Sequence, residues 1–386
     1  MYYWSLKEKE IIKDILVISE KYIKMIATVK FIQPALPNYR VPFYSYIASQ
    51  SSIKLFVFYA PSDRGVLTQE ELKEPWSKQT GKILKLPFGL QWQIGAISVP
   101  VAKGDYVVIS GAPRCVSNIV LLIIARFKGA KTIWWGHYWS ATTREWRFRL
   151  RLQLLRLADA VLFYTDEELK KYLDRTSVNQ RLPASALNNG LNLMPISRVR
   201  AQYLAKERPL NLFFIGRLTQ KAQFSLLLHA MARESLKSIY VKAIGDGSMR
   251  YDLQSLAKKL GVHERIQWIS ATVDESSIAE VANSCRLFVY PGEVGLSLIH
   301  GMAYGLPAIV HSSEKNHMPE IAAFEDGVTG ETFLRGSSED LARVIHSLIF
   351  DERRLDNYSM NSLKRIEKSF HAEDMAFRFL SLIDKL

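Results

Sequence analysis

The feature that most constrains this chain is a series of short segments that are apolar throughout, with helical patterns between them. A strand with one wet face alternates apolar and polar residues, whereas a strand buried on both faces is apolar along its whole length. Parallel strands covered by helices are buried in this way, so the sequence predicts an α/β fold of doubly wound parallel sheets. The expected strands are Met25–Ile32, Leu55–Tyr59, Tyr106–Ser110, Thr132–Trp135, Ala160–Tyr164, Leu210–Ile215, Ile239–Ile244, Ile266–Ile269, Leu287–Tyr290 and Ala308–His311.

The strands fall into two series, and a polar, basic stretch separates them. Asn188-Asn189-Gly190 is typical of a turn, and a new strand follows Arg208-Pro209. We therefore predict two Rossmann-like domains that face each other across a cleft. Their expected bounds are 25–195 and 209–360, with a linker at 196–208.

Both ends of the chain are predicted to be helical. Residues 1–24 have a charged amphipathic pattern, and a strand starts at a methionine directly after them. We therefore hypothesise that Met25 is the true start and that 1–24 is an extension. The sequence from Asp351 through Leu386 predicts helix, and we expect residues 361–386 to pack back on the N-terminal domain.

The charge balance points to an anionic partner. Lys and Arg exceed Asp and Glu by 51 − 38 = +13, which favours nucleic acid, anionic lipid or a phosphorylated substrate. Two cysteines, Cys115 and Cys285, are too few for a disulfide framework, and we expect both to be buried as small apolar residues. No apolar run reaches the ~18–20 residues that span a bilayer. We expect a cytoplasmic protein that contacts the inner face of the cell membrane.

The segment 290–307 is the richest in chemistry. A strand leads into a loop with Gly292 and Gly295, and a helix follows until Gly305-Leu306-Pro307 ends it. Unpaired N–H groups and the dipole at such a helix N-terminus attract phosphate groups. The alternative is an ordinary loop whose glycines only shape a turn.

Two more glycine-bearing loops follow expected strands. In the first, Arg217 and Lys221 come directly after a strand that ends at Gly216, where ligands of open α/β sheets bind. Arg217 could donate a fork of hydrogen bonds to a diphosphate, and Lys221 could add a point charge. The second loop, Gly245-Asp246-Gly247, is a weaker signal, since such a pattern is commonly a turn. Solvated loop charges are the alternative for the two cations.

These motifs, in this order, resemble the family 4 retaining glycosyltransferases of the GT-B fold. The resemblance is specific over 209–345 and looser over 25–200. In the N-terminal half, Pro37–Phe43 and Trp135-Gly136-His137 resemble a bacterial branch that builds surface polysaccharides, and Asn189–Asn192 resembles the family's Asn-Gly turn before the interdomain linker. The motifs are Gly216-Arg217-Leu218, Gly245-Asp246-Gly247, Glu293-Val294-Gly295-Leu296-Ser297, Met302–Pro307, Pro319-Glu320-Ile321 and Asp326–Gly330, with Pro37–Phe43, Trp135-Gly136-His137 and Asn189–Asn192 in the N-terminal half.

The resemblance implies a nucleotide-sugar donor, with UDP or GDP as the expected nucleotide, and neither a metal nor another cofactor. Arg217 would contact the donor diphosphate, and the N–H groups of Leu296 and Ser297 would hold phosphate. His137 would approach the transferred sugar, and no general base is assigned. The expected catalytic residues are His137 and Glu293; the expected donor-binding residues are Gly216, Arg217, Lys221, Gly245, Glu293, Val294, Gly295, Leu296, Ser297 and His300; and Tyr39 and Arg40 are expected on the acceptor side.

This sequence departs from the family pattern in three places. Aligned on Gly295, the family's first glutamate falls one place before Glu293, and its ribose-binding glutamate falls on His300. An imidazole can still bond a hydroxyl, with fewer acceptor sites than a carboxylate. The family's lysine falls one place after Lys221. Its early glycine pair is replaced by Pro34–Pro37.

The stretch 134–157 interleaves tryptophans with arginines. A basic helix with interfacial aromatics can lie on an anionic membrane, which would suit a polyprenyl-diphosphate-linked acceptor. A solvated helix with core aromatics and a site for single-stranded nucleic acid are the alternatives. Alternation with period two over 146–152 argues against a helix there.

The sequence thus predicts an enzyme that transfers a sugar, with retention, to a lipid-linked glycan in bacterial surface polysaccharide synthesis. A scaffold of the same fold without catalysis is the second hypothesis, motivated by His300 and the displaced Glu293. Nucleic-acid binding is the third, and we expect no nucleic-acid partner. His311 and His317, with Glu314 and Glu320, have a spacing that is too unspecific to predict a metal site.

Overall fold

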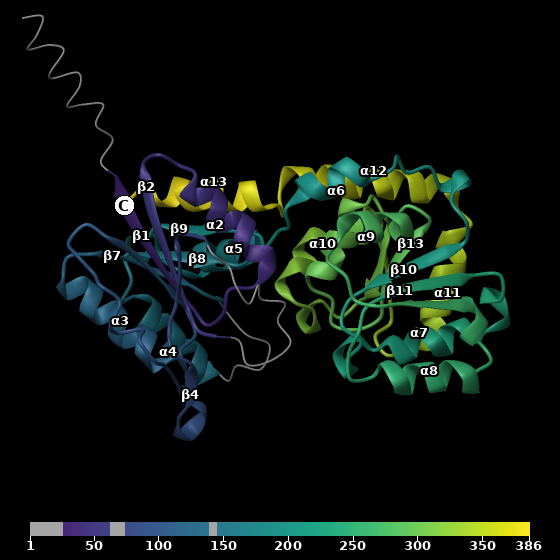
Figure 1. The fold of residues 1–386 in the computed structure, drawn as a ribbon, viewed down its shortest axis with the longest axis horizontal. Helices are drawn as coiled ribbons and strands as arrows, with labels where there is room; N and C mark the ends of the chain where they lie inside the picture. The colour runs from purple at the N-terminus through teal and green to yellow at the C-terminus, as the bar shows by residue number, and fades with distance from the viewer. Residues whose placement is uncertain (1–25, 62–73, 139–144) are drawn as a thin grey trace, which may run out of the picture. The chain divides into compact units, whose positions relative to one another are not determined.

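The computed structural model describes residues 26–61, 74–138 and 145–386 (Figure 1), so the predicted helix 1–24 and the Met25 start lie outside it. The strands are β1 (Ala27–Gln33), β2 (Ile53–Tyr59), β3 (Ser77–Gln79), β4 (Ile83–Lys85), β5 (Gln91–Gln93), β6 (Tyr106–Ser110), β7 (Lys131–Trp135), β8 (Ala160–Phe163), β9 (Ala184–Ala186), β10 (Asn211–Ile215), β11 (Tyr240–Ile244), β12 (Ile266–Ile269), β13 (Leu287–Tyr290), β14 (Ala308–His311) and β15 (Gly330–Phe333). The α-helices are α2 (Val41–Ala48), α3 (Val116–Phe127), α4 (Glu145–Leu155), α5 (Asp166–Arg175), α6 (Leu193–Val199), α7 (Phe224–Met231), α8 (Arg250–Lys259), α9 (Glu275–Ala282), α10 (Leu296–Ala303), α11 (Ser338–Ile349), α12 (Glu352–Lys368) and α13 (Ala372–Ile383).

The first sheet has the strand order β3-β2-β1-β6-β7-β8-β9. Its interior strand β1 pairs in parallel with β2 and with β6, so that Val29 lies opposite both Leu55 and Tyr106. Val29, Phe31 and Ile32 are buried. The apolar run therefore forms a strand because both faces of the sheet are covered.

The second sheet has the order β12-β11-β10-β13-β14-β15, with parallel pairing throughout. Helices cover both of its faces, with α7 and α8 on one side and α9 and α10 on the other (Figure 1). The order reverses between β10 and β13. Loops after these two strands therefore diverge and leave a crevice at the carboxyl edge of the sheet, where ligands of such folds bind.

Contacts divide the described chain into two units. The first comprises residues 1–36 and 44–133 as far as they are described, and the second comprises 37–43 and 134–386. The division falls inside β7, so the second unit contains the whole second sheet together with β8 and β9. The predicted domain bounds at 195 and 209 stay a prediction.

Each of the expected strands is present, with ends within about two residues of those predicted. The sequence did not predict β3, β9 and β15, which lie at sheet edges, nor the separate pair β4 and β5. These segments are short, and β3 (Ser77–Gln79) is polar throughout. These three edge strands carry no continuous apolar run, whereas the edge strand β12 (Ile266–Ile269) has three apolar residues and was predicted.

The predicted helical stretch from Asp351 through Leu386 consists of two helices, α12 and α13. Phe370 adopts a left-handed conformation with φ 68° between α12 and α13. There the backbone turns to pair with Leu191, whose N–H donates to the Phe370 carbonyl and whose carbonyl accepts from Ala372. The pairing brings α13 beside β9.

Both cysteines are unpaired and buried, as predicted, and burial raises the pKa of the Cys285 thiol to about 12. Among the helices of the described residues, none has the length and apolar character that crossing a membrane requires.

Gly190 allows the chain before Leu191 to pass close to the turn between α12 and α13, because a Cβ there would lie 2.0 Å from the carbonyl carbon of Phe370. We expect Gly190→Ala to lower the free energy of unfolding by about 3 kcal/mol through overpacking. Gly261→Ala is the control, since that glycine has a left-handed φ of 70° but open space around it; we expect a loss of about 1 kcal/mol. Urea unfolding of both variants checks this, and equal losses would contradict the steric argument.

Candidate functional site

Three glycine-bearing loops meet at the carboxyl edge of the second sheet. They follow β10, β11 and β13, and each was singled out by the sequence. The N–H of Gly216 donates to the Ile244 carbonyl at 3.0 Å, and that of Leu218 donates to Asp246 at 2.9 Å. These bonds hold the first two loops together.

The backbones approach so closely that a side chain would not fit. A Cβ on Gly245 would lie 1.9 Å from the carbonyl oxygen of Gly216, and one on Gly292 would lie 1.9 Å from that of Lys221. Without side chains, peptide groups of all three loops gather beside the N-terminus of α10. The Oγ of Ser297 is also there, 3.2 Å from the place a Gly216 Cβ would take.

The loop before α10 is fixed from behind by the segment after β14. The N–H of Val294 donates to Nδ1 of His317 at 3.2 Å, and its carbonyl accepts from the N–H of Met318 at 2.9 Å. Nε2 of His317 in turn donates to the His311 carbonyl at 2.9 Å, and the two rings stack with centroids 3.7 Å apart. Both nitrogens are thus used, and His317 must be neutral with its proton on Nε2.

The environment of the histidine pair favours this neutral form. Burial lowers the pKa of His317, with Arg335 acting in the same direction and Glu293 and the His311 carbonyl acting against it. Burial and His317 lower the pKa of His311 to about 4. The sequence suggested these histidines only as weak metal ligands, and their contact with the glycine loop was not predicted.

The predicted cations border the same loops. The ammonium of Lys221 lies 3.2 Å from a carboxylate oxygen of Glu293, and the lysine side chain is 77% exposed. Arg217 is exposed at the end of β10, close enough to Tyr290 that its charge opposes the burial that raises the pKa of that tyrosine to about 12. Both cations therefore face the open side of the loop cluster.

His300 contacts a carboxylate that the sequence analysis missed. Its Nε2 lies 3.1 Å from Oε2 of Glu275, the first residue of α9, and this oxygen also accepts from the hydroxyl of Tyr304 at 2.8 Å. An ionised carboxylate only accepts, so Nε2 of His300 donates to Glu275, and Nδ1 is the ring nitrogen that faces other partners. Tyr304 is buried, and burial followed by Glu275 raises its pKa.

His137 is also oriented by a carboxylate. Its Nδ1 lies 3.0 Å from Oε1 of Glu168, which accepts from the N–H of Tyr138, while Oε2 accepts from the N–H of Tyr164. Nδ1 of His137 thus donates to Glu168, and Nε2 is left for a ligand on a side chain that is 45% exposed. Thr165 and Glu168 match a capping-box pattern at the start of α5; that pattern could have identified the carboxylate.

The predicted acceptor-side residues lie in an aromatic cage. The guanidinium of Arg40 is buried 4.3 Å from the ring centroid of Trp135, and 5.6 and 5.8 Å from those of Tyr39 and Tyr164. Desolvation raises the pKa of Tyr39, against the charge of Arg40. Cation–π contact compensates a desolvated arginine.

Glu320 connects the acceptor-side residues with the glycine loop. Its Oε1 accepts from the side-chain amide of Asn189 at 2.9 Å, and its Oε2 lies 3.5 Å from where a Gly295 Cβ would be. Burial raises its pKa, against Asn189 and the charges of Arg40 and His137. Glu320 is thus a buried carboxyl group near Gly295 that is affected by the charges of Arg40 and His137. The sequence analysis named it only in the motif Pro319-Glu320-Ile321 and beside His311 and His317.

A cavity of about 570 Å³ lies against this part of the site. His137 and Glu168 line it, together with Lys171 and residues of the segment 313–322. Among the predicted site residues of the described chain, only His137 reaches it.

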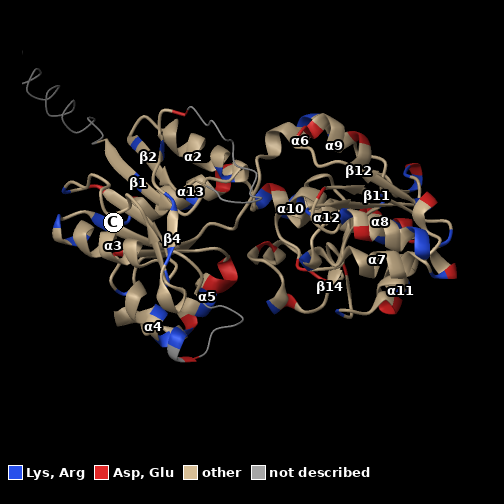
Figure 2. Cartoon of the chain, turned by 60° about the horizontal axis from the view of Figure 1, so that its bottom comes forward, with Lys and Arg blue, Asp and Glu red and all other residues tan. Residues whose placement is uncertain are grey.

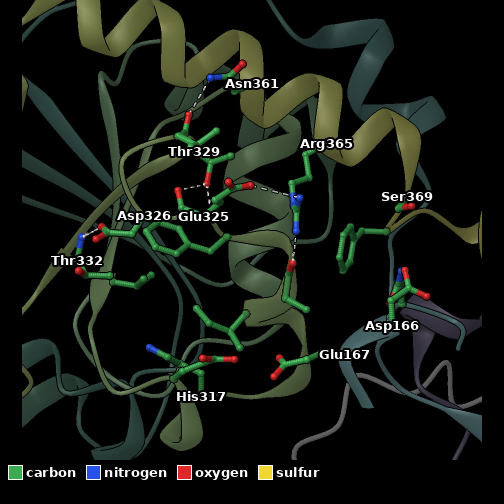
Figure 3. A pocket seen from close by; sticks show the side chains of 18 of the residues that line it. Asp166, Glu167, His317, Glu325, Asp326, Thr329, Thr332, Asn361, Arg365 and Ser369 are labelled. Atoms are coloured by element: carbon green, nitrogen blue, oxygen red, sulfur yellow. Dashed lines mark hydrogen bonds and ion pairs between the residues drawn. The ribbon is translucent and has the colours of Figure 1, made fainter. Parts of the chain in front are cut away.

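A larger cavity of about 950 Å³ lies beside β14, α12 and α5 (Figure 3). Its wall carries five carboxylates, those of Asp166, Glu167, Glu314, Glu325 and Asp326, and four cations, those of Lys364, Arg365, Lys368 and Arg378. Arg365 is bonded to Glu325 and to the Ala322 carbonyl (Figure 3), and Arg378 is paired with Asp166. The charges on this wall therefore nearly balance, and the wall has no strong electrostatic preference for an anion.

The basic, aromatic stretch divides between the core and the surface. Trp134 and Trp135 are buried in β7, so these aromatics cannot contact a membrane. Residues 145–155 form α4 despite their alternation, and Figure 2 shows its basic residues in blue. Phe148 packs edge-on against Tyr138. Trp139 and Arg144 lie outside the described residues.

Within residues 26–61, 74–138 and 145–386, no three His, Cys, Asp or Glu side chains lie close enough together to hold a metal ion.

Comparison with known proteins finds similarity in the C-terminal part. Residues 196–365 match the family model of glycosyl transferases group 1. A lipopolysaccharide core biosynthesis glycosyltransferase, LpsE of Rhizobium meliloti (strain 1021), is 24% identical over 169 residues, which are 44% of this chain and 48% of that protein. The chain spans about half the length of the curated relatives it matches.

Solved structures match almost the whole chain. The lipopolysaccharide outer core galactosyltransferase WaaB in its apo form aligns with a TM-score of 0.66 at 17% identity, over 93% of this chain and 100% of that one. Anabaena Alr3699/HepE in complex with UDP and glucose aligns with a TM-score of 0.64 at 15% identity, with the same coverage. These similarities confirm the predicted fold, an α/β fold with parallel sheets in two GT-B domains.

His317 gives a prediction about the glycine loop. Asn at 317 can offer an acceptor at the place of Nδ1, whereas Gln places its amide nearer the position of Nε2. We therefore expect His317→Gln to release the Val294 N–H and to raise its hydrogen exchange by about tenfold, the loss of a bond of about 1.4 kcal/mol. His317→Asn should retain most of the protection. Mass-resolved exchange of peptides that contain Val294 measures both.

The lowered pKa of His317 determines how the free energy of unfolding changes with pH. As pH falls below about 6.5, the unfolded chain takes up a proton that the folded His317 refuses, so the free energy of unfolding falls by up to about 1.4 kcal/mol per pH unit. His317→Asn should reduce this acid dependence. An unchanged pH slope, together with unchanged Val294 protection in His317→Gln, would contradict the assigned contact.

Proposed function

We propose that the protein is a retaining glycosyltransferase that moves a sugar from a nucleotide donor to a glycan acceptor in bacterial surface polysaccharide synthesis. The observation that carries the proposal is the meeting of three glycine loops at the N-terminus of α10, with Arg217 and Lys221 on the open side. Exposed N–H groups and cations together suit a diphosphate. The match of residues 196–365 to glycosyl transferases group 1 supports the same function.

The chemistry follows from where negative charge develops. The bond from the sugar to the diphosphate breaks, and the leaving diphosphate gains charge. Arg217, Lys221 and the N–H groups of Leu296 and Ser297 would stabilise that charge more in the transition state than in the ground state. We assign this stabilisation to these groups and propose that no metal or other cofactor takes part.

The acceptor would bind on the side of His137, Tyr39 and Arg40. Glu168 presents Nε2 of His137 toward its ligand side, and the cavity of about 570 Å³ offers room beside it. Glu293, held by Lys221, would lie at the donor side of the reaction. Because Glu320 lies near Gly295 and is affected by the charges of Arg40 and His137, we propose that it aligns the two sides.

The proposed donor is linked to UDP or GDP, and Anabaena Alr3699/HepE was solved in complex with UDP and glucose. The proposed acceptor is a polyprenyl-diphosphate-linked glycan at an anionic membrane surface on the cytoplasmic side. The charge of +13 suits both an anionic donor and an anionic membrane. No nucleic-acid partner is proposed.

Arg217 provides the first test. We expect Arg217→Ala to weaken the binding of UDP or GDP and the transfer from the matching sugar nucleotide by at least tenfold, about 1.4 kcal/mol. A thermal-shift titration detects binding, since ligand at 100 times its dissociation constant adds about 2.7 kcal/mol of stability. Arg233→Ala is the control, because Arg233 is exposed just after α7, at the far edge of the sheet. A wild-type protein that binds neither nucleotide would instead favour the scaffold hypothesis.

His300 provides the second test, on the nucleoside. If Nδ1 accepts from a ribose hydroxyl, His300→Ala should weaken the preferred nucleotide roughly fivefold, about 1 kcal/mol. The 2′-deoxy or 3′-deoxy form that lacks the bonded hydroxyl should bind the wild type and the variant equally. Calorimetric titration of the three nucleotides measures the difference. His229→Ala, an exposed histidine on α7, serves as the control; equal losses for all three nucleotides in His300→Ala would exclude a role in ribose binding.

A further inference from the structure

The pair β4 and β5 forms a hairpin in the first unit that carries an apolar tip. The two strands are antiparallel, with Leu84 opposite Trp92, and the turn Pro87–Gly89 connects them. Figure 1 shows the hairpin extending away from β1 and β2. Its base is firmly held, because the buried Gln93 bonds Ser117, Thr80 and the Gln33 carbonyl.

Exposed apolar side chains lie on and beside this hairpin. Phe88 at the tip is 100% exposed, and four large apolar residues of the segment 84–97 are 37–41% exposed. Single exposed apolar residues are ordinary, but several on one segment indicate a surface that another body covers. Leu84 and Leu90 belong to the hairpin, and Ile94 and Ile97 follow it.

The backbone at the tip favours the same interpretation. Phe88 has φ 60° and ψ 20°, a left-handed conformation that suits glycine or asparagine and is strained for a bulky side chain. A fully exposed phenyl ring gains nothing from burial within this chain that could offset that strain. The strained phenylalanine therefore points to a contact outside the chain.

Charge identifies the kind of contact. Between Pro75 and Gly104 the sequence has no Asp or Glu and has four lysines, of which Lys78, Lys82 and Lys85 are exposed on or beside the hairpin. Figure 2 shows blue along the ribbon at β4. An apolar tip with lysines behind it matches the depth profile of a bilayer, with acyl chains beyond anionic headgroups.

We propose that the β4–β5 hairpin inserts its tip, Pro87-Phe88-Gly89, into an anionic lipid bilayer, with Lys82 and Lys85 at the headgroups. The inference rests on the proposed function only in the choice of a membrane as partner, and it does not depend on sugar transfer. It replaces the buried Trp134 and Trp135 as the source of membrane contact with an element whose apolar residues are exposed.

Vesicle binding of the full chain tests this inference. The probes are vesicles of phosphatidylcholine with phosphatidylglycerol and vesicles of phosphatidylcholine alone, assayed by co-sedimentation. We expect the wild type to bind the anionic vesicles, and Phe88→Asn to weaken that binding about tenfold or more. Asparagine tolerates the left-handed conformation, so this variant should fold at least as stably as the wild type in urea unfolding.

Matched variants distinguish insertion of the hairpin tip from nonspecific binding to vesicles. Phe127→Asn removes another exposed phenylalanine, at the end of α3, and we expect it to leave vesicle binding unchanged. The double variant Lys82→Gln, Lys85→Gln should lose most of the preference for anionic over neutral vesicles. Both hairpin variants should keep the thermal shift with UDP or GDP, so a failure of donor binding is recognised separately.

Three outcomes would overturn the inference. The wild type could fail to bind anionic vesicles. Phe88→Asn could bind them as tightly as the wild type. Alternatively, the wild type could self-associate in light scattering while Phe88→Asn stays monomeric and binds vesicles equally well, which would make the tip a contact between protein chains.

Discussion

The structure of the site depends on how closely peptide groups can approach one another at the carboxyl edge of the second sheet. A Cβ on Gly245 or Gly292 would lie 1.9 Å from a neighbouring carbonyl oxygen, so any larger residue would push the loops apart. The loops could then not direct their N–H groups to one place. An anion site made of backbone groups needs no side-chain reorganisation when charge develops, because its dipoles are already oriented by the fold. Because of the glycines, the loops that follow these strands can direct their N–H dipoles toward one place.

Buried polar groups also hold the glycine loop before α10 in place. The N–H of Val294 points away from the crevice and must find an acceptor, and Nδ1 of His317 supplies it. That acceptor exists only while the ring is neutral, so the burial that lowers the pKa of His317 also keeps the loop in place. Glu168 acts in a similar way on His137, and Glu275 on His300. For each histidine, a neighbouring carbonyl or carboxylate accepts from one ring nitrogen. The other ring nitrogen is therefore the one that can bond a further group.

The sequence was sufficient for what local patterns determine. Apolar runs predicted the buried strands, since burial on both faces leaves a continuous signal, but not β3 or β15, which carry no continuous apolar run. The glycine loops were found because their spacing from a strand is local. The contacts of Glu275, His317 and Glu320 were not predicted because their partners, His300, Val294 and Asn189, lie far away in the sequence. Only the packing of the folded chain brings each of these pairs together.

Composition alone does not show which aromatic residues lie at the surface. Trp134 and Trp135 stand next to a run of arginines in the sequence, which resembles a membrane helix, yet both are buried, and Trp135 packs against Arg40. Phe88 stands in an unremarked segment between a proline and a glycine and is fully exposed. The deciding quantity is the free energy each ring already gains within its own chain: a buried indole has been transferred out of water, and an exposed phenyl has not. Attraction to an apolar partner therefore belongs to the side chain that folding leaves in water, and here that side chain lies on a strained turn with lysines beside it and no carboxylate within reach along the segment.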